Sequence, residues 1–265
     1  MLKTRALTAL AGMPVLLFFA YLGKYWYAIL ILFLSFLALR EYFALARKGG
    51  WKPFETAGYI FIPAVLLAVY QSNLLLVISI LVLLFAFLNF LPVFFQGRVK
   101  YWESAVTFWG IIYTGGLAGF LLAIRLLPDG FLLTIFLFFV IWSADIFAYL
   151  VGRKFGKRPL ASRISPKKTV EGFLAGLTGS AVIGSALMFF FPLPYLNWQG
   201  GALLGFLSGF VGTIGDLSQS AMKRSVGAKD SGSLLPGHGG ILDRFDSLFF
   251  TAPFFYFYLY FTGMI

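Results

Sequence analysis

The chain has 265 residues, of which 60% are hydrophobic and 12% charged, and its formal net charge is +11. Soluble domains are nearer half apolar and a quarter charged, so this composition excludes an ordinary soluble domain and indicates a membrane protein with several spans. The absence of cysteine excludes disulfides and thiolate chemistry. The 33 phenylalanines are typical of lipid contact and helix packing, with an aromatic substrate site as the alternative.

Hydrophobic segments along the chain predict about nine transmembrane helices, since each span needs about 20 mostly apolar residues. The first segment starts with basic residues as a signal peptide does, but no convincing cleavage site follows, and we interpret it as a retained helix. The third segment contains Pro63 and is separated from the fourth by a short polar connection, which leaves eight spans as the alternative. In chain order the predicted spans are 5–22, 25–46, 56–71, 73–95, 102–126, 131–152, 169–191, 200–223 and 243–263.

The positions of the basic residues favour nine spans over eight. With nine spans and a cytoplasmic N-terminus, every lysine and arginine except Lys24 and Arg125 lies on the cytoplasmic side, whereas eight spans would distribute them over both sides. We therefore predict an all-α polytopic protein of the cell inner (cytoplasmic) membrane, with the C-terminus outside. Topology then explains most of the net charge, and no nucleic-acid partner is expected.

Four aspartates near the predicted cytoplasmic helix ends are candidate metal ligands: Asp145, Asp216, Asp243 and Asp246. Intramembrane acids usually mark ion or substrate sites, and clustered carboxylates are oxygen ligands suited to Mg²⁺. The alternative is that each aspartate pairs with a nearby basic residue for stability alone. Without cysteine and with a single histidine, zinc and haem sites are not expected.

The first polar segment, residues 152–168, is rich in lysine and arginine. A positively charged cytoplasmic loop is one interpretation, and anion binding is the other, because glycine lets backbone N–H groups approach a ligand while basic side chains supply charge. Ser165, Lys167, Lys168 and Thr169 lead into a helix whose N-terminal N–H groups favour a phosphate. The segment is not a P-loop, because the GxxxxGK[ST] pattern is absent.

The second polar segment, residues 223–243, contains the sequence LPGHGG at positions 235–240. Such glycine-rich sequence is incompatible with a helix and predicts a tight turn that exposes backbone donors. His238 is the only histidine of the chain. General acid/base work, phosphate contact and loop ordering are all open as its role.

The second polar segment and its flanks resemble the signature of the bacterial phosphatidate cytidylyltransferase (CDP-diacylglycerol synthase) family. The matching residues are Ser220, Lys223, Arg224, Lys229, Asp230, Gly232, Pro236, His238, Gly239, Gly240, Asp243, Arg244 and Asp246. The stretch SADIFAYLVGRKFGK followed by ISPKKTVEG is similar to a second polar block of that family. The matched blocks lie in the C-terminal half, whereas the first 100 residues share only their hydrophobic character.

The resemblance implies Mg²⁺-dependent conversion of CTP and phosphatidate, a membrane lipid, into CDP-diacylglycerol and pyrophosphate. One or two Mg²⁺ ions are expected, a monovalent ion is left open, and a homodimer is a further expectation from the resemblance. The predicted catalytic residues are Asp216, Lys223, Arg224, Asp243 and Asp246. The predicted substrate-binding residues are Ser165, Lys167, Lys168, Thr169, Lys229, Asp230, His238, Gly239, Gly240 and Arg244. The predicted metal ligands are Asp216, Asp243 and Asp246, with Asp145 as a further candidate.

These expectations divide the chain into N-terminal transmembrane helices of open role, residues 1–100, and a catalytic region, residues 101–265, with cytoplasmic loops at 152–168 and 223–243. Two other functions share some of the features. A CTP-using lipid kinase would also need basic loops and acids, but it would release CDP. A lipid transporter would need a polar path across the bilayer, and the predicted outer segments carry few charges.

Overall fold

The computed structural model describes residues 2–234 and 239–265, with side-chain surroundings from residue 12 onward. The chain forms two compact units. The first comprises Met1–Leu126 and Ser225–Arg244, and the second comprises Leu127–Arg224 and Phe245–Ile265. The residues of the signature are therefore divided between the two units, and each unit is described by itself.

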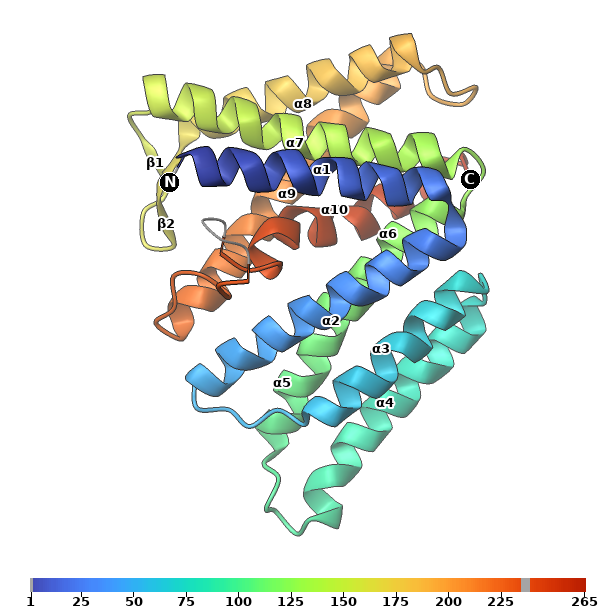
Figure 1. Cartoon of the computed structure of the whole chain (residues 1–265), viewed down its shortest axis with the longest axis vertical. Coiled ribbons are helices and arrows are strands. Elements are labelled where there is room, and N and C mark those ends of the chain that lie inside the picture. The colour runs from blue at the N-terminus through green and yellow to red at the C-terminus, as the bar shows by residue number, and fades with distance from the viewer. Residues whose placement is uncertain (1, 235–238) are drawn as a thin grey trace. The chain divides into compact units, whose positions relative to one another are not determined.

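The first unit is a helical bundle around α2. Its helices are α1 (Leu2–Leu22), α2 (Lys24–Lys48), α3 (Glu55–Tyr70), α4 (Leu74–Phe94) and a rod of α5 (Tyr101–Ile111), the π-helical turn η1 (Ile112–Gly116) and α6 (Leu117–Leu126). Helix α2 packs against α1, α3 and the α5–η1–α6 rod (Figure 1). It buries Tyr27, Ile31, Leu39 and Phe43 almost completely, and these side chains form the centre of the core.

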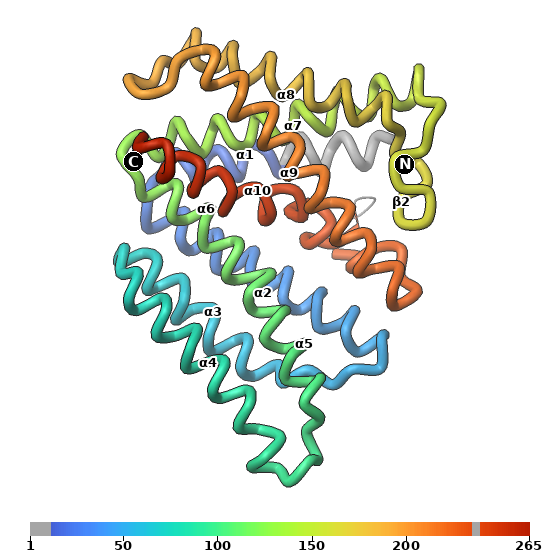
Figure 2. Tube along the Cα trace, turned by 180° about the vertical axis from the view of Figure 1, so that it is seen from behind, coloured from blue at the N-terminus to red at the C-terminus, as the bar shows by residue number. Residues whose placement is uncertain are grey.

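The second unit contains α7 (Gly130–Phe155), α8 (Val170–Phe190), α9 (Trp198–Ser225, of which Ser225 belongs to the first unit) and α10 (Leu242–Phe261, which begins in the first unit). Helices α7 and α8 lie side by side along most of their length (Figure 2). The core contains Phe138 and Phe249, together with Phe136 and Phe255, whose ring centroids are 5.8 Å apart. Aromatic side chains on α7 and α10 therefore join these two helices.

Helical structure covers each of the predicted spans, with ends that differ by a few residues. Pro63 lies inside α3 without ending it, and the side chain of Asn73 caps α4 by accepting the N–H of Leu76 at 2.9 Å. The region 56–95 therefore forms two helices rather than one broken element. In the described part of the chain, six helices are long and apolar enough to cross a membrane. The chain is a polytopic membrane protein, and the count of nine spans stays a prediction.

The exposed surface agrees with a bilayer environment. Helix α4 leaves large apolar side chains uncovered along its length: Leu74, Leu75, Ile78, Val82, Leu83, Phe85, Phe90, Val93 and Phe94. In water such a surface would lead to association, whereas lipid tails cover it without cost.

The first polar segment contains a β-hairpin, which the hydrophobic pattern of the sequence does not predict. Strands β1 (Pro159–Ala161) and β2 (Ser165–Thr169) pair antiparallel, with Pro159 opposite Thr169 and Ala161 opposite Ser165. The fold is therefore all-α apart from this hairpin, and the segment is not an irregular loop throughout. Strands are recognised by alternation of apolar and polar residues, which the sequence SPKKT lacks.

Glycine allows α7 and α8 to approach closely at their polar ends. A Cβ atom on Gly172 would lie 2.6 Å from the carbonyl oxygen of Ala148 and 3.0 Å from the Cα of Gly152. Both neighbours are backbone atoms, so the helices would have to separate to make room for a side chain. This contact fixes the start of α8 against α7, directly beside the hairpin.

We predict that Gly172→Ala lowers the stability of the protein by about 1–3 kcal/mol, because overpacking against backbone forces the helices apart. The measurement is the midpoint of thermal unfolding in mild detergent. Gly119→Ala on α6 is the matched control, since its Cβ would find only ordinary contacts at 3.6 Å and alanine is the better helix former. Equal midpoints for Gly172→Ala and the wild type would contradict the close approach.

Candidate active site

A lysine and an aspartate from different elements meet in the second unit. Lys168 on β2 donates from its Nζ to Oδ2 of Asp216 on α9 at 2.5 Å, and each side chain is less than a third exposed. Ser220, one turn further along α9, donates its hydroxyl to the other oxygen of Asp216 at 3.3 Å. Lys168 of the first polar segment thus meets Asp216 and Ser220 of α9 in one cluster within this unit.

A second carboxylate lies beside this pair. Asp246 on α10 is buried, and it is close enough to Asp216, Asp145 and Lys168 to interact electrostatically with all three. Its Oδ1 accepts the N–H of Ser247 at 2.7 Å. Asp246 therefore lies near two other predicted metal ligands, Asp216 and Asp145, and near the Lys168 that pairs with Asp216.

Glycine again permits this arrangement. A Cβ on Gly215 of α9 would lie 2.6 Å from the Cβ of Phe250 and 2.9 Å from the carbonyl oxygen of Asp246. Helices α9 and α10 can therefore approach at the level where Asp216 and Asp246 project. A larger residue at position 215 would separate the two carboxylates.

The acidic side chains of this cluster could supply only some of the ligands of a hard cation such as Mg²⁺. Among the described residues, no three His, Asp or Glu side chains lie close enough together to hold a metal ion by themselves. Mg²⁺, however, is usually bound through one or two carboxylates and keeps waters and substrate phosphate oxygens as its other ligands. The pair of Asp216 and Asp246 fits that donor set.

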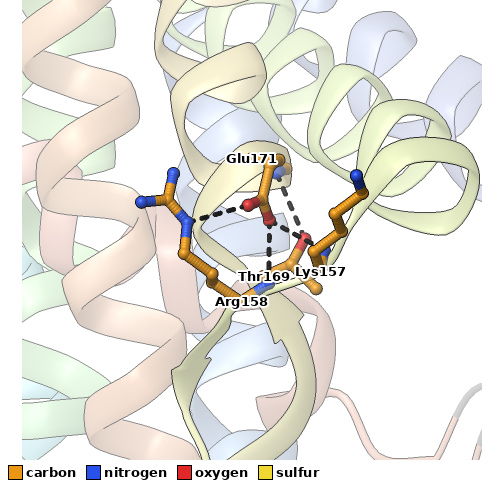
Figure 3. A network of polar contacts seen from close by, with 5 residues as sticks. Lys157, Arg158, Thr169 and Glu171 are labelled. Carbon is orange, nitrogen blue, oxygen red and sulfur yellow. Dashed lines mark hydrogen bonds and ion pairs between the residues drawn. The ribbon is translucent and has the colours of Figure 1, made fainter.

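The base of the hairpin is held by the carboxylate of Glu171, which is not among the residues predicted from the sequence. Glu171, in the first turn of α8, accepts the backbone N–H groups of Lys157 at 3.0 Å and Arg158 at 3.2 Å, and its Oε1 pairs with the Arg158 Nε at 3.0 Å (Figure 3). Thr169 caps α8 by accepting the N–H of Gly172 at 3.2 Å. These contacts fix the orientation of β2, which presents Lys168 to Asp216.

Basic side chains lie on the hairpin and at the end of α9. Arg224, at the end of α9, donates from its Nε to the carbonyl oxygen of Ile164 at 3.3 Å. Lys167 is exposed on β2, Ser165 is half-buried on the same strand, and Lys223 is buried on α9. The second unit thus combines exposed cations with a half-buried Lys–Asp pair, as a site for a polyanion requires.

In the first unit, Asp243 organises the second polar segment. Its Oδ2 accepts the backbone N–H of Ser231 at 2.8 Å and that of Gly240 at 3.0 Å. Gly239 has a φ of 81°, in the left-handed region that glycine adopts most readily. The sequence predicted a metal ligand at Asp243, and that role stays a prediction. The hydrogen bonds that the structure describes for it join the two ends of a loop.

Glu41 of α2 also accepts hydrogen bonds from this loop. Its Oε2 accepts the hydroxyl of Ser231 and the backbone N–H of Leu242, and its Oε1 accepts the backbone N–H of Ile241, each at 2.9 Å. Glu41 is not among the residues predicted from the sequence. An acid within a predicted transmembrane span, in the sequence FLALREYF, was the available signal.

Other predicted residues of the segment lie at the surface. Lys229, Asp230 and Arg244 are exposed. The role predicted for His238 concerns a residue outside the described part of the chain. Lys229, Asp230, Gly239, Gly240, Asp243 and Arg244 belong to the first unit, whereas Lys168, Asp216, Lys223, Arg224 and Asp246 belong to the second.

The chain is similar to known proteins over nearly its whole length. The model of the "Cytidylyltransferase family" matches residues 3–262. Three relatives, each named phosphatidate cytidylyltransferase, come from Bacillus subtilis (37% identical, 97% of both chains), Synechocystis sp. (35%, 96% of this chain and 95% of the relative) and Staphylococcus saprophyticus (36%, 95% and 96%).

The similarity extends through the first 100 residues, for which the sequence alone indicated only hydrophobic spans. The resemblance first recognised in the signature is confirmed over the full length. The chain therefore belongs to the phosphatidate cytidylyltransferase family.

Proposed function

We propose that this protein joins CTP to phosphatidate in the membrane, forming CDP-diacylglycerol and releasing pyrophosphate. Full-length similarity to proteins named phosphatidate cytidylyltransferase supports this activity. The main structural support for this site is the contact of Lys168 with Asp216 beside the buried Asp246. It combines a cation with carboxylate oxygens, and Asp246 belongs to the signature. A polyanionic nucleotide and a lipid phosphate both need such a site.

In the proposed reaction a phosphate oxygen of phosphatidate forms a bond with the α-phosphorus of CTP. The bond from that phosphorus to the bridging oxygen of the β-phosphate breaks, and pyrophosphate leaves with the electron pair. The lipid supplies the nucleophile, so no covalent intermediate with the protein is needed. Catalysis then consists of positioning the two phosphates and neutralising charge as it develops on the leaving group.

Asp216 and Asp246 would hold Mg²⁺, with Asp243 as the further predicted ligand from the signature and Asp145 as a candidate. The ion, when bound, would neutralise charge on the phosphate oxygens. One or two ions are compatible with the reaction, and a monovalent ion is left open.

Basic side chains of the protein would neutralise the phosphate charge that Mg²⁺ does not. The half-buried amine of Lys168 is paired with Asp216 and would be available to a phosphate oxygen when that carboxylate engages a cation. Lys167 precedes it on β2, and Arg224 at the end of α9 contacts the carbonyl oxygen of Ile164. We assign both to phosphate binding and keep Lys223, which is buried on α9, as a predicted catalytic residue. Ser165 and Thr169 are predicted contacts on the same strand.

The first unit is assigned a binding role through the second polar segment. Gly239 and Gly240 would offer backbone donors, Lys229 and Arg244 charge, and Asp230 a hydrogen-bond acceptor. His238 is the remaining predicted contact of this segment.

The distribution of basic residues supports a cytoplasmic active site. We propose nine spans in the inner membrane with the N-terminus in the cytoplasm and the C-terminus outside, which places both polar segments where CTP is available. A homodimer is expected from the family resemblance.

One assay separates this activity from the alternatives. We expect purified protein supplied with labelled CTP, phosphatidate and Mg²⁺ to produce a lipid carrying CMP together with one equivalent of pyrophosphate. A lipid kinase would release CDP and leave the lipid with an added phosphate. Absence of both lipid products, with phosphatidate moved across vesicle membranes, would favour a transporter.

We predict that Asp246→Asn lowers turnover by about 100-fold, because an amide cannot replace a buried carboxylate as an Mg²⁺ ligand. The measurement is turnover as a function of Mg²⁺ concentration in protein of unchanged unfolding midpoint. The control is Asp129→Asn, at the residue that precedes the first turn of α7, and this variant should behave as the wild type. Near-normal activity of Asp246→Asn at low Mg²⁺ would exclude the ligand role.

We predict that Lys168→Ala raises the apparent KM for CTP or for phosphatidate by about tenfold, since it removes a cation from a site where a charged hydrogen bond to phosphate contributes about 1.5–3 kcal/mol. The measurement is a pair of substrate titrations, each at saturating concentration of the other substrate. Arg98→Ala removes an exposed charge outside the site and is the control. Two unchanged KM values would rule out phosphate binding by Lys168.

A further inference from the structure

The C-terminal half of α2 forms a platform for the second polar segment. Lys48 donates from its Nζ to the carbonyl oxygen of Gly227 at 3.3 Å, and a Cβ on Gly49 would contact the side chain of Val226. Two turns earlier on the helix, Glu41 contacts Ser231, Ile241 and Leu242. The platform therefore follows the segment from its beginning to the start of α10.

Glu41 is the buried part of this platform. It is 8% exposed, and both carboxylate oxygens accept hydrogen bonds from the loop. A carboxylate only accepts, and here each of the three groups facing it is a donor. The match is therefore specific: an amide at this position would direct an N–H₂ group at another donor.

The loop is shaped to this carboxylate. A Cβ on Gly232 would lie 2.8 Å from Oε1 of Glu41, and Gly240 is in similar contact with the same side chain. Asp243 holds the backbone of Ser231 and Gly240, so Glu41 and Asp243 together join the residues before and after positions 235–238. Ser231 is held by both, through its hydroxyl and its backbone N–H.

We propose that Glu41 is a positioning residue for the reaction: by holding Ser231, Ile241 and Leu242 it fixes the backbone of the signature segment in the geometry that binds phosphate. This inference rests on the proposed function, and it gives the N-terminal helices a part in the reaction. Glu41 acts through the loop and does not itself touch substrate.

Glu103 provides a matched comparison within the same unit. It is also a buried acid, 9% exposed, but it accepts the backbone N–H of Lys100 at 2.9 Å at the start of its own helix. A substitution there perturbs a buried carboxylate of the first unit without touching the segment. It separates loss of a specific anchor from general damage to the bundle.

The experiment measures amide hydrogen exchange and turnover in full-length Glu41→Gln, Glu103→Gln and wild-type protein. In Glu41→Gln we expect exchange in peptides covering Ile241 and Leu242 to be at least about tenfold faster, with peptides of α3, α4 and α8 unchanged. We expect kcat at saturating substrates to fall by about tenfold or more. Glu103→Gln should leave exchange in those peptides and kcat unchanged.

Unchanged exchange at Ile241 and Leu242 in Glu41→Gln would overturn the proposal, and so would uniform acceleration throughout the first unit. Should Glu41→Gln fail to fold, Ser231→Ala, which removes one donor to Glu41, replaces it with the same local pattern expected at smaller amplitude. Exchange is measured without substrates, so it decides the anchoring even if the wild type shows no cytidylyltransferase activity, a result that would count against the proposed function instead.

Discussion

A carboxylate enclosed by apolar helices must receive hydrogen-bond donors or a counter-charge, because leaving it unpaired costs several kcal/mol. This constraint explains the polar architecture of the protein. Asp216 takes the amine of Lys168, Asp243 takes two backbone amides, and Glu41 takes a hydroxyl and two backbone amides. Each pairing joins an apolar helix to a polar segment, so the need to satisfy the acids also places the loops that are proposed to bind substrate.

The same pairings explain why a membrane enzyme of this kind can be assembled from plain hydrophobic helices. Backbone groups of a helix satisfy one another, and lipid covers the apolar surface. Specific geometry is then needed only where polar groups gather. Glycines at positions 172 and 215 let helices approach there, and Glu171 fixes the hairpin that carries Lys168.

Much of the fold follows from composition and periodicity. Runs of about 20 apolar residues have no stable form in a bilayer other than a helix, so each predicted span coincides with helical structure even where Pro63 weakened the pattern. The hairpin at 159–169 could not be predicted this way, because its strands are short, polar and held by backbone pairing and by Glu171. The signature identified the family, but it could not predict the role of Glu41, because the partners of Glu41 lie about 190 to 200 residues away in the chain.

The sequence by itself therefore determined the membrane class, the helical segments, the family and the candidate residues, since these depend on local hydrophobicity and on a specific motif. Only the tertiary structure decided which charged groups meet. It paired Lys168 with Asp216, placed Asp246 beside them, and assigned Glu41 and Asp243 to the two ends of one loop. Such pairings depend on where packed helices bring distant residues together, and no local pattern in the chain encodes that distance.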